Sequence, residues 1–116
     1  MSVRIYHNPR CSKSRETLKL LEEKGLQPEV VEYLKHPPTT EELTDILNKL
    51  GLQPRQLMRT QEAEYKENGL DDNSLSDAEL IAAMIRIPKL IERPIVVVNG
   101  KAAVGGHRAV HRFQLG

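Results

Sequence analysis

Two strand-like runs enclose one helical pattern at the start of the chain, and this order constrains the fold more than any other feature. Residues 3–6 are β-branched and aromatic, residues 12–24 have the apolar spacing of an amphipathic helix, and residues 29–34 form a second strand-like run. Gly25 suits the left-handed position just past a helix end. Strand, helix and strand make a βαβ unit, so the two strands are expected to be parallel with a right-handed crossover.

The chain ends in a predicted hairpin, and helices fill the stretch before it. Residues 95–98 are continuously apolar, as in a strand buried on both faces, and Asn99-Gly100 after them is the strongest short signal for a tight turn between two strands. Helical segments are expected at 41–50 after a Thr40 cap, at 54–59, at 62–68, from a Ser76–Glu79 capping box to Pro88, and at 107–113.

This order of elements predicts an α/β fold of the thioredoxin-like type. We expect a four-stranded mixed sheet flanked by helices, with a helical insertion at about 36–87, and a single domain over residues 1–116. Such folds place a cysteine at the junction of the first strand and helix, facing a proline before the third strand. Pro94 stands at that position, and we expect a cis Arg93–Pro94 bond.

Composition excludes several classes of function. Lysine and arginine number 17 against 16 acids, and the net charge of +1 gives no long-range attraction to nucleic acid or to anionic membranes. Aromatic residues make up 3% of the chain, too few for a base-stacking platform. No apolar run reaches the length of a spanning helix, and no signal segment precedes the first strand. A single cysteine favours a reducing, cytoplasmic setting.

Cys11 is the candidate nucleophile. It is expected at a helix start, where unpaired N–H groups and the positive end of the helix dipole stabilise a thiolate and attract an anion. His7, Arg10, Lys13 and Arg15 surround it in a polar loop. This setting favours a reactive thiol with a lowered pKa over the alternative, a buried structural cysteine.

Position 14 limits the redox chemistry. Ser14 makes the motif C-x-x-S rather than C-x-x-C, and Cys11 is the only cysteine, so a dithiol cycle within one molecule is excluded. A Cys-x5-Arg anion loop would need arginine where Thr17 stands. Cys11 is therefore expected to be a single nucleophile that an external thiol regenerates, and Ser12 and Ser14 are expected to cap the helix start.

Arg59 and Arg93 are the candidate oxyanion ligands. Arg59 is expected at the end of an apolar helical turn, and Arg93 directly precedes Pro94. A guanidinium keeps its charge and offers a planar fork, so two of them would offset the repulsion between a thiolate and a doubly charged anion. The alternative for both is an ordinary surface salt bridge.

The histidines have weaker signals. His7 is either a partner that favours the Cys11 thiolate or a solvated loop residue. His107 and His111 have the spacing of metal ligands on a helix face, but no Cys, Asp or Glu framework accompanies them. We therefore expect no metal site.

Several ordered motifs resemble the glutaredoxin-dependent arsenate reductase family, in particular its short bacterial branch. They are residues 5–15 around Cys11, Tyr33-Leu34 followed by Pro37-Pro38, Leu57-Met58-Arg59, and residues 91–97 around Arg93-Pro94. The likeness runs from residue 3 to about residue 105. It implies a thioredoxin-like fold and the reduction of arsenate to arsenite.

The resemblance also implies roles for particular residues. The cysteine that matches Cys11 attacks arsenic and forms a thiol–arsenate adduct, glutathione attacks next, and glutaredoxin resolves the mixed disulfide. The arginines that match Arg59 and Arg93 hold the oxyanion. The histidine that matches His7 lowers the pKa of the cysteine, and His7 and Ser14 are the residues expected to activate the nucleophile. The implied partners are arsenate and glutaredoxin, with glutathione as co-substrate and no bound cofactor, and we expect a monomer.

The family's third arginine has no clean match. The family places it just after the last strand, where this chain has Gly105 or Gly106, and Arg108 follows two or three residues later as the candidate. A charge-assisted contact contributes about 1.5–3 kcal/mol, so its loss would lower the rate or affinity by one to two decades.

Two other functions fit the same residues. The C-x-x-S motif also suits a related monothiol oxidoreductase that acts on mixed disulfides. A non-enzymatic protein-binding module similar to the Spx-type regulators is the second, although Ser14 removes the C-x-x-C switch that those proteins often carry.

Overall fold

In the computed structural model, residues 2–105 and 112–113 are described, and the chain divides into two compact units. Unit 1 combines Met1–His36 with Arg93–Gly116, and unit 2 is Pro37–Glu92. Unit 2 corresponds to the helical insertion that the sequence predicts. That residues 1–116 form a single domain stays a prediction.

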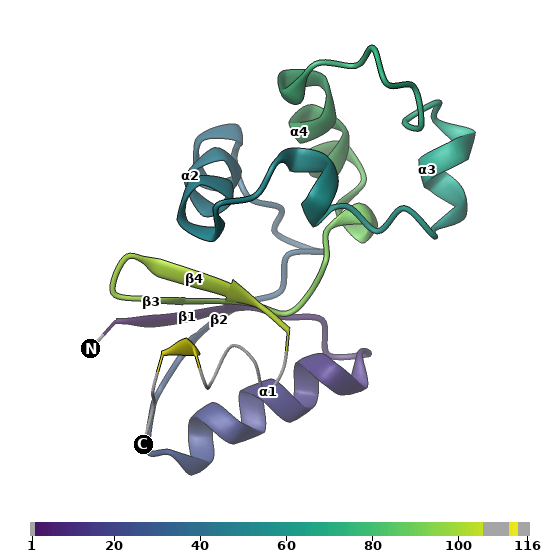
Figure 1. Ribbon diagram of the computed structural model, residues 1–116. Coiled ribbons are helices and arrows are strands. Elements are labelled where there is room, and N and C mark those ends of the chain that lie inside the picture. The colour runs from purple at the N-terminus through teal and green to yellow at the C-terminus, as the bar shows by residue number, and fades with distance from the viewer. Residues whose placement is uncertain (1, 106–111, 114–116) are drawn as a thin grey trace. The chain divides into compact units, whose positions relative to one another are not determined.

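Unit 1 is built on a four-stranded sheet (Figure 1). The strand β1 (Val3–Tyr6) pairs in parallel with β2 (Glu29–Val31) and antiparallel with β3 (Ile95–Val98), and β3 pairs antiparallel with β4 (Lys101–Val104). The order across the sheet is β2-β1-β3-β4, and the helix α1 (Ser12–Glu23) connects β1 to β2. The predicted mixed sheet with an N-terminal βαβ unit is therefore confirmed.

The helix α1 is attached to one face of the sheet by its apolar side. Leu21 is completely buried in a cluster with Val3, Ile5 and Val96, and Leu18 packs against the edge of that cluster. Burying a leucine side chain of this kind contributes roughly 1.5–3 kcal/mol. Because the helix is fixed to the sheet, its first turn is held beside the end of β1.

The hairpin between β3 and β4 has the geometry that its residues predict. Asn99 and Gly100 have φ angles of 48° and 86°. Positive φ at both central residues defines the type I′ turn, which matches the twist of the flanking strands. The pair Val98 and Lys101 closes the ladder next to the turn.

The strand β2 is shorter than expected. It ends at Val31 rather than continuing to residue 34. The carbonyl of Glu32 accepts hydrogen bonds from the N–H groups of Lys35 (3.0 Å) and His36 (2.9 Å), so the chain turns at this point. The backbone groups that would extend the ladder are therefore engaged in a turn.

Unit 2 is helical. Its elements are α2 (Thr40–Leu50), the short 3-10 helix η1 (Pro54–Leu57), α3 (Ala63–Glu67), α4 (Asp77–Arg86) and the 3-10 helix η2 (Pro88–Leu90). The helix α4 packs against α2, η1 and η2. Leu43, Met84 and Leu90 are among the side chains that this packing leaves with 0% exposure.

Two capping boxes begin the longer helices of unit 2. Ser76 and Glu79 form the predicted box at the start of α4, with the Glu79 N–H donating to Ser76 Oγ at 3.2 Å. At α2 the cap is Thr39 and not Thr40, because the Thr39 hydroxyl accepts from the Glu42 N–H (3.1 Å) while the Glu42 carboxylate accepts from the Thr39 N–H (3.2 Å).

None of the helices within the described part of the chain is long and apolar enough to cross a membrane. Most of the helix predicted at 107–113 lies outside the described residues.

Candidate functional site

Cys11 lies at the start of α1, at the position that the sequence predicts. It is the N-cap residue, with extended backbone (φ −94°, ψ 122°), and its thiol is partly exposed. The cap is thus Cys11 itself, so the expectation that Ser12 or Ser14 caps the helix is wrong. A thiol at an N-cap is close to the unpaired N–H groups of the first turn.

The pKa of the Cys11 thiol lies below its ordinary value. Burial is the largest influence and raises the pKa, but hydrogen bonds from the backbone N–H groups of Ser14 and Lys13, together with the charge and side-chain hydrogen bond of Arg93, outweigh it. Each of these groups stabilises the anion in preference to the neutral thiol. The site therefore favours a thiolate.

Asn8 shapes the loop before Cys11, and the sequence reasoning did not identify it. Its carbonyl accepts from the Cys11 N–H at 3.0 Å, and its side-chain Oδ1 accepts from the Arg10 N–H at 3.0 Å. These bonds close a turn over Asn8-Pro9-Arg10-Cys11. Asparagine followed by proline is a known turn-initiating pair, so the signal was present in the sequence.

His7 and Ser14 form a buried pair beside this turn. The Ser14 hydroxyl lies 2.7 Å from His7 Nδ1 and accepts from the Asn8 N–H at 3.0 Å, and both side chains are buried. Burial is the largest influence on the pKa of His7 and lowers it; the charge of Glu32 opposes this and the smaller effect of Arg15 adds to it, so the pKa lies below its ordinary value. His7 is therefore neutral at neutral pH. Its ring holds Ser14, whose backbone N–H is one of the groups that stabilise the Cys11 thiolate.

Arg93 and Pro94 bring the start of β3 into the site. The Arg93–Pro94 peptide bond is cis, and Pro94 is buried. Arg93 supplies the guanidinium that stabilises the Cys11 thiolate, so the structure brings these two sequence-predicted residues together. A helix N-terminus and a guanidinium acting on one thiolate also suit a bound oxyanion.

Gly105, which follows β4, is hydrogen-bonded to the Arg93-Pro94 segment. Its N–H donates to the Pro94 carbonyl at 3.0 Å, and its φ is +101°. A residue with a side chain would be strained at that φ. Gly105 is one of the two positions where the resemblance would place the third arginine, and its conformation favours glycine. Arg108 itself, like His107 and His111, lies outside the described residues.

Arg59 belongs to unit 2. It follows η1 in an extended segment, not a helical turn, because Met58 and Ile91 form an antiparallel bridge and the Arg59 N–H donates to the Leu90 carbonyl at 2.7 Å. This corrects the expected helical position.

The Arg59 guanidinium forms ion pairs within its own unit. Its Nη1 lies 2.8 Å from Glu62 Oε1 and its Nε lies 3.6 Å from Glu92 Oε1. The sequence reasoning identified neither acid, although Glu62 follows Arg59 at the i, i+3 spacing typical of such pairs. The role of Arg59 as an oxyanion ligand stays a prediction.

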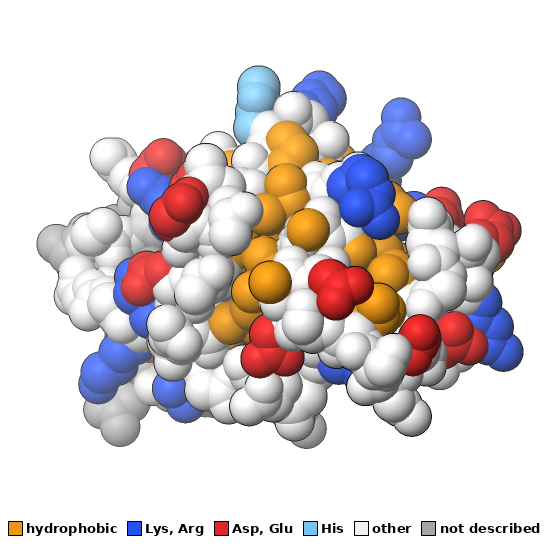
Figure 2. Space-filling model, turned by 90° about the horizontal axis from the view of Figure 1, so that it is seen from above, with side chains coloured by type: hydrophobic (Ala, Val, Ile, Leu, Met, Phe, Trp, Pro, Cys, Tyr) orange, Lys and Arg blue, Asp and Glu red, His pale blue; other side chains and the backbone are white. Residues whose placement is uncertain are grey.

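The described residues hold no group of three or more His, Cys, Asp and Glu side chains suited to a metal ion. Their charges are of both signs, and Figure 2 shows acidic and basic side chains interspersed over one face rather than gathered into a patch of one sign.

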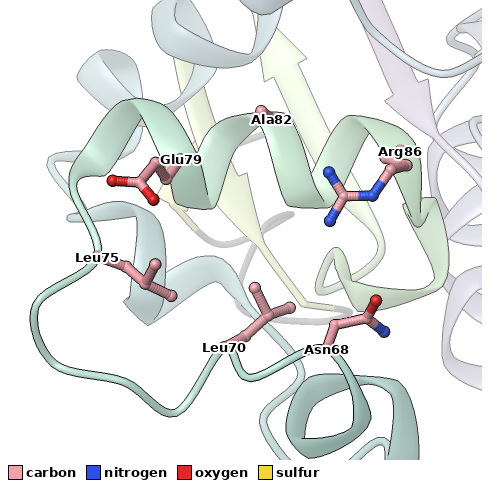
Figure 3. Close-up of a pocket in the computed structure, with 6 residues that line it drawn as sticks. All are labelled: Asn68, Leu70, Leu75, Glu79, Ala82 and Arg86. Carbon is pink, nitrogen blue, oxygen red and sulfur yellow. The ribbon is translucent and has the colours of Figure 1, made fainter.

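A pocket of about 290 Å³ lies in unit 2, and none of the predicted site residues is among those that line it (Figure 3). Glu79, Ala82 and Arg86 line it from one side of α4, and Asn68, Leu70 and Leu75 line it from the preceding loop. The small side chain of Ala82 stands between the two charged ones on the helix, which leaves the space open.

Comparison with known proteins gives a consistent result. The sequence matches the ArsC family over residues 6–112. The uncharacterized protein YfgD of Escherichia coli K12 is 60% identical over 104 residues, which cover 89% of this chain and 87% of that protein. An arsenate reductase of Neisseria meningitidis serogroup A is 56% identical over 104 residues, which cover 89% of each.

A solved structure shows the same fold. It is an arsenate reductase from Vibrio cholerae, with a TM-score of 0.92 and 52% identity over 99% of this chain and 98% of that chain. The thioredoxin-like fold expected from the order of elements is confirmed, as is the resemblance that the motifs indicate. The match covers nearly the whole chain and includes both the Cys11 loop and the Arg93-Pro94 segment. The chain therefore belongs to the ArsC family.

Proposed function

We propose that this protein is an oxidoreductase that reduces arsenate to arsenite through a thiol–arsenate adduct on Cys11, with glutathione and glutaredoxin as the reducing partners. The observation that carries the proposal is the stabilised Cys11 thiolate, which has the N–H groups of Ser14 and Lys13 and the guanidinium of Arg93 beside it. The same groups are suited to hold an oxyanion in front of the sulfur.

The chemistry balances with one cysteine. The Cys11 thiolate attacks arsenic, and a protonated arsenate oxygen leaves as water, which forms an S–As bond to As(V). A glutathione thiolate then attacks Cys11 Sγ, the S–As electron pair moves to arsenic, and arsenite leaves with arsenic as As(III). The Cys11–glutathione disulfide that remains is attacked at the glutathione sulfur by glutaredoxin, which releases the Cys11 thiolate. The two sulfurs of that disulfide have supplied the two electrons.

Other residues have supporting roles in this proposal. Arg59 and Arg93 bind the oxyanion, and Arg108 is the candidate for a third contact. His7 and Ser14 activate the nucleophile by holding the first turn of α1, since the Ser14 hydroxyl bonds His7 Nδ1 and accepts from the Asn8 N–H. The protein is expected to act as a monomer in the cytoplasm, where a reducing environment keeps the single thiol available.

The test is turnover coupled to glutathione oxidation. Arsenate-dependent NADPH consumption is measured with glutathione, glutaredoxin and glutathione reductase, and we expect Cys11→Ser to abolish it while Ser12→Ala retains it. Omitting glutaredoxin is expected to stop turnover after the mixed disulfide forms. Absence of arsenate-dependent turnover in the wild-type protein at every concentration would overturn the proposal.

A second candidate function rests on the same partly exposed thiolate without a resolving cysteine. Such a thiol is also suited to attack a glutathionylated protein. Release of glutathione from a glutathionylated peptide, without arsenate turnover, would favour this reading. A stoichiometric RNA polymerase complex that persists in Cys11→Ser would favour the binding-module reading instead.

A further inference from the structure

Five charged side chains of unit 2 form a connected cluster around Arg59. Glu62 contacts Arg59 (Oε1 to Nη1, 2.8 Å) and also Lys89 (Oε2 to Nζ, 3.4 Å). Lys89 in turn contacts Glu64 at 3.3 Å, and Glu92 contacts Arg59 at 3.6 Å. Glu62 is therefore the residue that links the two cations.

Both the backbone and the side chain of Arg59 are fixed by this arrangement. The Arg59 N–H donates to the Leu90 carbonyl at 2.7 Å, and the Arg59 carbonyl accepts from the Glu62 N–H at 3.2 Å. The side chains of Arg59 and Glu62 are only 26% and 19% exposed. Partly buried pairs of this kind are screened less by solvent and salt than fully exposed ones. The Arg59 side chain is therefore held at both ends, by the backbone hydrogen bonds at its base and by the Glu62 carboxylate at its guanidinium.

We propose that Glu62, which also contacts Lys89, is a positioning residue: it orients the Arg59 guanidinium and weakens the attraction between that guanidinium and the oxyanion. This inference rests on the proposed function, in which Arg59 binds the oxyanion. A guanidinium carries five N–H donors, so donors remain for an oxyanion while Nη1 and Nε face the two carboxylates. The positive charge of Lys89 partly offsets the negative charge of Glu62, so Glu62 weakens oxyanion binding by Arg59 less than it would alone.

The proposal predicts opposite effects for two substitutions. Glu62→Gln removes the negative charge beside Arg59, so the oxyanion binds more tightly, but it also loosens the guanidinium, so the transition state is held less well. Lys89→Met leaves the Glu62 charge directed at Arg59 alone, so the oxyanion binds less tightly. Exposed and partly exposed pairs contribute about 0.2–1 kcal/mol, which corresponds to changes of up to about fivefold.

The experiment combines kinetics with an anion-binding measurement that needs no turnover. For Glu62→Gln we expect KM for arsenate and kcat both to fall by about two- to fivefold, and for Lys89→Met we expect KM to rise by a similar factor. Protection of Cys11 from iodoacetamide by sulfate is measured in parallel and is expected to shift to lower sulfate concentration in Glu62→Gln and to higher concentration in Lys89→Met. Glu64→Gln is the matched control, because it breaks the other Lys89 contact without touching Arg59.

The outcomes separate the inference from the proposed function. Effects of Glu62→Gln no larger than those of Glu64→Gln, or a rise in KM with unchanged kcat, would overturn the positioning role while arsenate turnover stands. A wild-type protein without turnover, in which sulfate protection still tightens in Glu62→Gln, would overturn the arsenate proposal and support the positioning role. Sulfate protection that is unchanged in Arg59→Met would overturn the inference through its premise.

Discussion

Replacing Ser14 with alanine tests whether one buried hydroxyl holds the Cys11 loop in place. Ser14 is 0% exposed, and its Oγ lies 2.7 Å from His7 Nδ1 and accepts from the Asn8 N–H at 3.0 Å. Alanine fills nearly the same volume, so the perturbation is the loss of the two hydrogen bonds rather than a cavity. It leaves an imidazole nitrogen and a backbone N–H without their partner.

The size of the effect follows from the burial of those two groups. A buried donor or acceptor that loses its partner costs about 1–3 kcal/mol. His7 is buried, whereas Asn8 is only partly buried, so its unpaired N–H group is expected to cost less. We therefore expect Ser14→Ala to lower the free energy of unfolding by about 2–4 kcal/mol, a large fraction of the roughly 5–15 kcal/mol of a small domain.

The assay is equilibrium unfolding in urea, with Thr17→Val as the matched control. Thr17 lies in the same helix, is also 0% exposed, and its hydroxyl donates to the Lys13 carbonyl at 2.8 Å. That carbonyl also belongs to the helix ladder, so removing the hydroxyl leaves no group unpaired, and a loss of about 0–1 kcal/mol is expected. If the two variants lose equal stability, the reasoning from unpaired partners is refuted.

Three further predictions concern the thiol, the buried histidine and the pocket. Arg93→Met is expected to raise the pKa of Cys11 and so move the alkylation midpoint to higher pH, whereas Arg10→Met moves it less; equal shifts would contradict the assigned role. The folded-state pKa of His7 is lowered, so the unfolded chain takes up this proton first as pH falls below about 6.5, and the free energy of unfolding decreases there; His7→Asn should flatten that slope in urea titrations at several pH values. Ala82→Leu fills the unit 2 pocket and should leave the Cys11 alkylation rate unchanged, while a slower rate would tie the pocket to the site.

Local signals predicted the elements where neighbours in sequence decide the structure. The Ser76–Glu79 capping box and the Asn99-Gly100 turn depend on residues within three positions of one another, and both are present as predicted. Thr39 has the same relation to Glu42, so the true cap of α2 was also readable from the sequence. The end of β2 was not, because residues 32–34 are compatible with a strand and only the turn at the Glu32 carbonyl stops it.

The same distinction between local and long-range signals applies to the candidate site. Cys11 at a helix start follows from the strand and helix patterns on either side of it, and Arg93 beside the thiol follows from the pairing of β1 with β3. The bond between His7 and Ser14 depends on how α1 leaves the sheet, and the contact between Glu62 and Lys89 joins residues far apart in sequence. Residue types alone do not determine such contacts.

The return of the chain from unit 2 to unit 1 places two functions on adjacent residues. Glu92 ends unit 2 and pairs with Arg59, while Arg93 begins the second part of unit 1 and stabilises the Cys11 thiolate. One peptide bond therefore separates the two charged residues along the chain, whereas the other crossing, at His36 and Pro37, carries neither. A residue inserted between Glu92 and Arg93 would separate the Arg59 ion pair from the Cys11 ligand along the chain, so variation in chain length is expected in the loops of unit 2 and not at this junction.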